Sequence, residues 1–194
     1  MISRVQTRAV SQPVVFSGIP RLTAVEKGML RWITVDPRDR VLDAGISSGL
    51  AAEYLCRNMQ CEVCGLSSSM EKVRRARERL TNCDIIYGGA GEIPWHDASF
   101  DIVMFSGEDG DSGRCRSLLR ESFRVLREGG ELVLGLKTFP RIGYGETRGE
   151  EESLPAGKKS LLALLEGLGF HHCSWIRTGL TTAVVVGWKP GLPS

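Results

Sequence analysis

Short apolar runs rich in β-branched residues alternate with stretches of helical periodicity along most of the chain, and this alternation constrains the fold more than any other feature. After a first helical stretch at 22–33, further ones at 50–58, 69–80 and 113–127 separate the runs. A strand, helix, strand order of this kind predicts a parallel sheet covered by helices on both faces, with right-handed crossovers. The expected strands lie at 40–45, 62–66, 84–87, 102–106 and 131–136.

Within the expected strands, the runs 41–42, 102–105 and 132–134 are apolar at consecutive positions, as expected for central strands buried on both faces. A helix at 158–168 precedes two last β runs, which only four residues separate, so these runs pair antiparallel as a hairpin. The predicted fold class is therefore α/β: a doubly wound, mostly parallel seven-stranded sheet with an antiparallel C-terminal hairpin and helices on both faces.

Length and composition bound the class of protein. A chain of 194 residues fits one domain over 1–194, with 1–20 as an N-terminal extension that lacks the apolar core of a secretion signal. The net charge of +2 gives no electrostatic reason to expect nucleic acid, and no apolar run is long enough to cross a membrane. Six scattered cysteines indicate reduced thiols, so we expect a cytoplasmic protein. The sequence leaves the oligomeric state open.

The first strand-to-helix turn is the candidate ligand site, because open α/β sheets bind ligands beyond the carboxyl ends of their strands. The segment 43–49 has the sequence Asp-Ala-Gly-Ile-Ser-Ser-Gly, in which Gly45 and Gly49 allow a tight turn and close approach of a ligand to the backbone. Taken alone, the same residues are as well explained by a simple turn and helix cap.

Further segments in the same order carry a family resemblance. The run 41–49 is similar to the first motif of class I S-adenosylmethionine-dependent methyltransferases, and 88–95 and 99–103 are similar to their third and fourth strand segments. The run 120–132, with its Gly-Gly turn, resembles the type 11, quinone-biosynthesis-like branch, and 167–170 resembles the Ala-Gly-Phe of that branch. The resemblance covers about 40–189 and implies a Rossmann-like methyltransferase fold with S-adenosylmethionine as cofactor.

Carried over position by position, the resemblance implies that the glycine turn holds the methionine and ribose side of the cofactor, the end of the second strand the ribose, and the segment after the third strand the adenine. The implied residues are Asp43, Gly45, Ile46, Ser47, Gly49, Leu66, Ser67, Gly89, Ala90, Gly91 and Ser106. Three of them depart from the family pattern, since Ser47 replaces a glycine while Ser67 and Gly89 replace acidic residues. Loss of a carboxylate that accepts ribose hydroxyls weakens binding by about tenfold or more.

The loop after the fourth strand and a histidine supply the catalytic candidates. Glu108 and Asp109 could orient or deprotonate an acceptor, although a solvated acidic loop is the favoured interpretation, and His96 could reach the cofactor cleft. We expect no metal site at Cys61 and Cys64, whose spacing has no second ligand pair. The segment 137–157 is long for a connection and is expected to cover the substrate through Phe139, Ile142 and Tyr144.

Two functions follow as hypotheses. The first is transfer of a methyl group from S-adenosylmethionine to a small molecule, and the second is a degenerate methyltransferase-like domain that acts as a binding or regulatory module.

On the helix 69–80, Met70, Val73, Ala76 and Leu80 define the expected buried stripe. Its arginines then lie on a solvated face rather than on a nucleic-acid surface.

Overall fold

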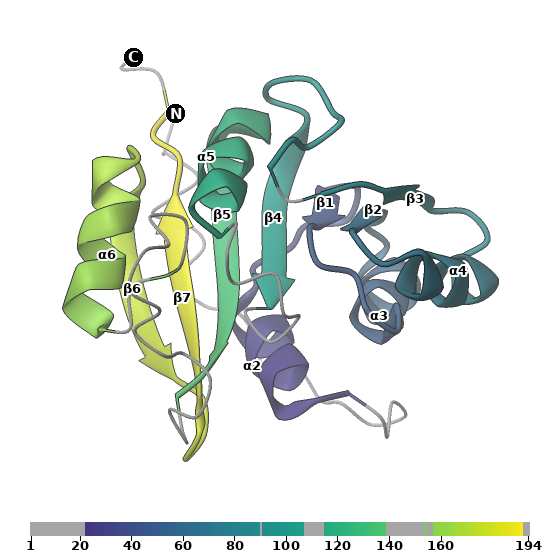
Figure 1. Cartoon of the computed structure of the whole chain (residues 1–194), viewed down its shortest axis with the longest axis horizontal. Coiled ribbons are helices and arrows are strands. Elements are labelled where there is room, and N and C mark those ends of the chain that lie inside the picture. Colours follow the sequence, from purple (N-terminus) through teal and green to yellow (C-terminus); the bar gives the residue numbers. More distant parts are fainter. Residues whose placement is uncertain (1–21, 90, 107–114, 139–153, 155–156, 192–194) are drawn as a thin grey trace.

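The computed structural model describes residues 22–89, 91–106, 115–138, 154 and 157–191, and they form a seven-stranded sheet with helices on both faces (Figure 1). The strand order is β3-β2-β1-β4-β5-β7-β6. This arrangement confirms the predicted fold class. The strands are β1 (Arg40–Asp43), β2 (Glu62–Ser67), β3 (Asp84–Tyr87), β4 (Phe100–Ser106), β5 (Leu126–Lys137), β6 (His171–Arg177) and β7 (Thr182–Trp188).

The sheet is parallel from β3 to β5, and the predicted central strands β1, β4 and β5 lie side by side at its middle. β7 pairs antiparallel with both β5 and β6, which confirms the C-terminal hairpin. The hairpin joins the sheet through its second strand, so that β7 separates β5 from β6. Sequence spacing alone does not indicate which strand of a hairpin lies inside.

Helices form one layer on each face. α2 (Ala24–Trp32), α3 (Leu50–Met59) and α4 (Met70–Arg79) contribute their buried residues to one apolar cluster. α5 (Cys115–Val125) and α6 (Lys158–Gly167) contribute theirs to the cluster on the opposite face. In Figure 1, α3 and α4 lie beside β1 to β3, while α6 lies beside β6. None of the helices in the described ranges has the length and apolar character needed to cross a membrane.

The lead helix α2 begins with a capping box and packs closely on the sheet. The Thr23 hydroxyl accepts a hydrogen bond from the Glu26 amide at 3.1 Å, and the Glu26 carboxylate accepts one from the Thr23 amide at 2.7 Å. Beneath the helix, a β-carbon at Gly135 of β5 would lie 2.4 Å from Val25 and 2.7 Å from the Met29 sulfur. Only glycine at this position lets α2 approach the sheet so closely.

β5 begins five residues earlier than the strand expected from the sequence. The expected helix runs to residue 127, whereas α5 ends at Val125 and strand geometry continues through the Gly-Gly pair. Gly129 has a positive φ of 72°, and its amide donates to the Lys189 carbonyl at 2.9 Å, while the Lys189 amide donates to Gly130. The chain after β7 thus pairs with the segment that the sequence assigns to a turn.

The expected extension 1–20 and the Phe139, Ile142 and Tyr144 contacts lie outside the described residues.

Candidate functional site

The carboxyl ends of the parallel strands meet at one edge of the sheet, and the strand order reverses there between β1 and β4. β1 ends at Asp43, β2 at Ser67, β3 at Tyr87 and β4 at Ser106. In open α/β sheets, ligands bind at such a reversal. The residues predicted to hold a cofactor, apart from Ala90, which lies outside the described residues, therefore come from segments that leave this edge.

Backbone hydrogen bonds tie the glycine turn after β1 to both neighbouring strands. The Ala44 amide donates to the Met104 carbonyl of β4 at 2.8 Å, and the Ile46 amide donates to the Leu66 carbonyl of β2 at 3.0 Å. Asp43 is 8% exposed, and one of its carboxylate oxygens accepts from the Gly45 amide at 3.4 Å. These ties fix the path of the turn across the reversal point.

The turn ends at Gly49, which starts α3 and has a left-handed backbone with φ of 74°. A β-carbon there would lie 3.3 Å from Leu80 and 3.4 Å from Ala76, so both backbone strain and the proximity of α4 favour glycine. Gly49 supplies no side-chain cap, and the Ser48 hydroxyl accepts only from the Leu50 amide, at 3.4 Å. Amides and the positive end of a helix dipole are thus available to a polar ligand.

The end of β2 carries a serine where the family resemblance implies an acid. Ser67 is 8% exposed, and its hydroxyl accepts a hydrogen bond from the Ser69 amide at 3.3 Å. Its carbonyl accepts from the Gly88 amide at 3.0 Å, which continues the pairing of β2 with the segment after β3. Ser67 therefore organises the start of α4, and this position supplies no charge to bind ribose hydroxyls.

The segment after β3 contains two of the residues predicted to bind the adenine, Gly89 and Gly91. Gly89 is half-buried, and its carbonyl accepts from the Glu92 amide at 3.4 Å, whereas Gly91 is exposed with no atom within 4 Å of where a β-carbon would stand. Ser106, at the end of β4, is also half-buried. The open space at Gly91 leaves room for a ligand group beside the segment after β3.

The structure does not bring His96 to this edge. Its carbonyl accepts from the Ser99 hydroxyl at 2.7 Å, and Ser99 immediately precedes β4, so the exposed His96 lies near the amino end of that strand. The expectation that His96 reaches the cleft is therefore wrong, because the connection from β3 to β4 must cross from one edge of the sheet to the other. Glu108 and Asp109 lie outside the described residues.

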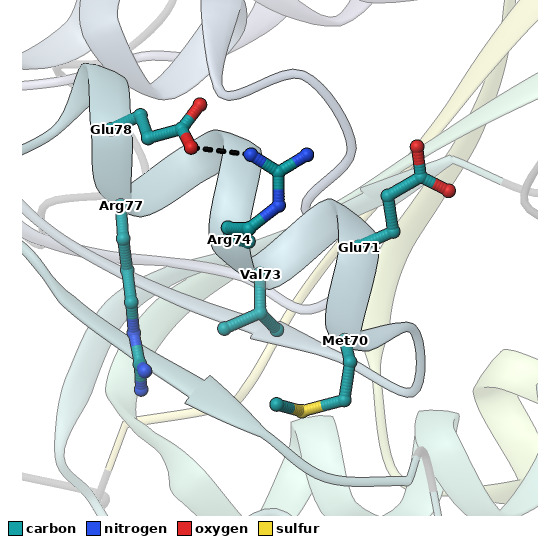
Figure 2. Close-up of a pocket in the computed structure, with 6 residues that line it drawn as sticks. All are labelled: Met70, Glu71, Val73, Arg74, Arg77 and Glu78. Atoms are coloured by element: carbon teal, nitrogen blue, oxygen red, sulfur yellow. Dashed lines mark hydrogen bonds and ion pairs between the residues drawn. The ribbon is translucent and has the colours of Figure 1, made fainter.

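A pocket of about 570 Å³ lies along α4, away from the glycine turn (Figure 2). Met70 lines it and is 61% exposed, which corrects the expectation that Met70 belongs to the buried stripe; Val73, Ala76 and Leu80 are buried as expected. Met70 is the first residue of α4, a helix that packs against β3, the edge strand of the sheet. The lining residues are Met70, Glu71, Val73, Arg74, Arg77 and Glu78.

The arginines of α4 are occupied by partners. Arg74 pairs with Glu78 and Arg75 with Glu71, four residues apart on the exposed helix surface. Arg79 donates to the Ser48 carbonyl of the glycine turn at 3.1 Å. These three arginines are therefore engaged within the protein, and the bond from Arg79 ties α4 to the glycine turn.

None of the six cysteines, all of which lie within the described residues, is joined in a disulfide. Cys61 packs with the α2, α3 and α4 layer and Cys64 with the α5 and α6 layer, so they lie on opposite faces, and burial raises the pKa of each to about 11. In the part of the chain that the structure describes, no three His, Cys, Asp or Glu side chains are grouped to hold a metal ion. Cys56 of α3 and Cys83 before β3 bring their sulfurs to 3.4 Å.

A parallel sheet with one inserted antiparallel strand, and a glycine turn at its reversal point, define the class as a Rossmann-like, nucleoside-binding α/β protein. Residues 41–130 match the methyltransferase domain family. This match and the curated relatives confirm the resemblance to class I S-adenosylmethionine-dependent methyltransferases, the family whose cofactor is S-adenosylmethionine.

Among curated relatives, 27-O-demethylrifamycin SV methyltransferase from Amycolatopsis mediterranei is 35% identical over 121 residues, which cover 59% of this chain and 43% of the relative. Demethylmenaquinone methyltransferase from Thermotoga maritima is 34% identical over 103 residues, covering 53% of this chain and 44% of the relative. The matches thus span less than half the length of these two relatives.

Solved structures agree on the fold. A chain from the complex between the Haloferax volcanii Trm112 methyltransferase activator and a methyltransferase superposes with a TM-score of 0.71. The match has 19% identity and covers 86% of this chain and 89% of the other. This likeness is one of fold and supports the seven-stranded architecture described above.

Proposed function

We propose that the protein binds S-adenosylmethionine at the carboxyl edge of β1, β2 and β4 and transfers its methyl group to a small-molecule acceptor. The observation that carries the proposal is the glycine turn at the strand reversal, which is tied to β2 and β4 by backbone bonds and opens onto the uncapped start of α3. A turn that only joined a strand to a helix would not need a left-handed glycine packed against α4.

The residues present fit this cofactor. Amides at the start of α3 suit the polar tail, the open space at Gly91 suits a base, and Ser67 offers a hydroxyl to the ribose. The bound cofactor supplies an activated methyl group on a sulfonium. The chain's own part is to hold donor and acceptor in line, which needs no catalytic triad. Glu108 and Asp109 remain our candidates for orienting the acceptor.

The acceptor class is proposed on two grounds. The relatives described above are named for small molecules, a rifamycin precursor and a demethylated menaquinone. Arg74, Arg75 and Arg79 of α4 are each paired with a glutamate, which favours a solvated helix face over a nucleic-acid surface. We also propose that the segment 137–157 covers this acceptor. Because the cysteines are not joined in disulfides, we propose a cytoplasmic location.

Calorimetry with S-adenosylhomocysteine tests the proposal. The wild-type protein is expected to bind it, and a ligand concentration about 100 times Kd should stabilise the fold by about 2.7 kcal/mol in a thermal-shift assay. Gly45→Val should abolish binding because its side chain fills the turn. Gly167→Val is the matched control, since a β-carbon at Gly167 meets nothing within 4 Å on α6. Absence of wild-type binding at about 1 mM ligand would refute the proposal.

One observation favours the second function, that of a degenerate binding module. The ribose position of β2 is a serine whose hydroxyl already accepts from the Ser69 amide. A module of this kind would fold normally and show neither methyl transfer nor a shift in melting temperature with S-adenosylhomocysteine. The same calorimetric experiment therefore separates the two functions.

A further inference from the structure

The connection between β3 and β4 has no regular secondary structure from 91 to 99, yet two side chains of α5 hold its backbone. Arg124 donates to the Ile93 carbonyl at 2.8 Å and to the Trp95 carbonyl at 2.9 Å. Glu121 accepts from the Ile93 amide at 2.9 Å. Both backbone groups of Ile93 are thus bonded to side chains of one helix.

Arg124 and Glu121 also bind each other through two parallel bonds. The guanidinium Nε donates to Glu121 Oε1 at 2.9 Å and Nη2 donates to Oε2 at 2.7 Å, a fork geometry that lysine cannot reproduce. Arg124 further pairs with Asp97 at 2.7 Å. The bond from Arg124 lowers the pKa of the Glu121 carboxyl below its ordinary value, so this carboxylate is charged at neutral pH.

The network lies directly after the segment assigned to the nucleoside base. Ile93 is 1% exposed and stands two residues beyond Gly91, so its side chain anchors the connection in the core while Arg124 and Glu121 fix its backbone. The packing of α5 itself rests on Leu118, Leu119 and Val125. The helix therefore does not need the ion pair in order to be buried.

We propose that Arg124 and Glu121 are positioning residues for the cofactor: by holding Ile93 and Trp95 they set the course of the backbone at Gly89 and Gly91 against the base. This inference rests on the proposed function, since it requires a nucleoside at the sheet edge. Neither residue touches the base itself; both act through the backbone of the connection. Their loss is expected to lower affinity for the cofactor, while the affinity for the acceptor stays unchanged.

The test uses Arg124→Gln, Arg124→Lys and Glu121→Ala, with Arg75→Gln as a control that breaks a surface ion pair of α4. The Kd for S-adenosylhomocysteine, from calorimetry, is expected to rise about tenfold or more in Arg124→Gln and Glu121→Ala. Arg124→Lys should lie between these variants and wild type, because lysine keeps the charge and loses the fork. Arg75→Gln should match wild type.

Two further readouts separate positioning from general stability. In turnover assays, the KM for S-adenosylmethionine should rise while kcat and the acceptor KM hold. Hydrogen exchange of the ligand-free protein should show faster exchange at the Ile93 amide in Glu121→Ala, with α5 itself still protected.

The outcomes distinguish this inference from the proposed function. Wild-type binding with an unchanged Kd in Arg124→Gln and Glu121→Ala overturns the positioning role and leaves the methyltransferase proposal standing. Equal losses of cofactor affinity, acceptor affinity and kcat also overturn the role, because they indicate a structural defect. Failure of the wild type to bind S-adenosylhomocysteine overturns the proposed function itself.

Discussion

Oxidation of Cys56 and Cys83 to a disulfide is expected to stabilise the protein by about 3.5 kcal/mol. The two sulfurs lie 3.4 Å apart on residues separated by 27 positions, so a bond closes a loop of that length in the unfolded chain. The loss of unfolded-state entropy for this loop gives the magnitude. Formation of the bond needs an approach of only about 1.4 Å, which side-chain rotation on α3 and in the turn before β3 can supply.

The assay is a comparison of melting temperatures before and after treatment with glutathione disulfide. Each protein thiol loses a proton and an electron, and the reagent leaves as two molecules of reduced glutathione. At about 2–4 °C for each kcal/mol in a chain of this length, the melting temperature should rise by about 7–14 °C. Burial and the neighbouring thiol raise the pKa of Cys83 to about 12, so the reaction should accelerate as pH rises toward that value.

Cys83→Ser is the matched control, because it removes one partner and leaves the other cysteines in place. The oxidant should leave its melting temperature unchanged. Mass spectrometry must show the Cys56–Cys83 bond in the oxidised wild type. If that bond forms completely and the melting temperature does not rise, the loop-closure reasoning is refuted.

Three other outcomes are expected. Ser67→Asp should restore a carboxylate at the ribose position and tighten S-adenosylhomocysteine binding about tenfold in calorimetry; weaker binding would show that ribose lies elsewhere. Gly135→Ala should destabilise the fold by about 1–3 kcal/mol in urea unfolding, because the new methyl group meets Met29, whereas Gly167→Ala should not. The pKa of Cys64 is raised to about 11 by burial, so folding favours its protonated thiol, and the stability this gives below about pH 9 should be lost as pH rises through 11. Cys64→Ala should show a smaller fall in unfolding free energy between about pH 8 and pH 11, and an unchanged fall would contradict the assignment.

Much of the architecture was predictable from the sequence because the physics of its elements is local. Consecutive apolar residues at 102–106 identified a strand buried on both faces, and that strand lies at the centre of the sheet. The short spacing of the last two runs allowed only antiparallel pairing. The insertion of β7 beside β5 was not predictable, since it depends on which strand of the hairpin pairs with β5 rather than on spacing.

Within the candidate site, the sequence predicted the glycine turn after β1, but it did not predict where His96 lies or what Glu121 and Arg124 hold. Gly45 and Gly49 signalled the turn, and the positive φ of Gly49 gives a physical reason for that residue. His96 was misplaced because its position depends on how the connection crosses the sheet. The Glu121 and Arg124 pair carries the sequence pattern of an ordinary surface ion pair three residues apart, and only the tertiary structure shows that it holds Ile93.

Because β7 lies between β5 and β6, it determines the order in which the last strands can join the sheet during translation. β6 leaves the ribosome first but has no position in the sheet until Thr182–Trp188 follows, so the part of the sheet beyond β5 assembles last. The nucleoside edge is formed by strands made much earlier, from β1 to β4. A nascent chain halted before β7 would then present a nearly complete cofactor edge beside an open flank of β5, where another strand could add.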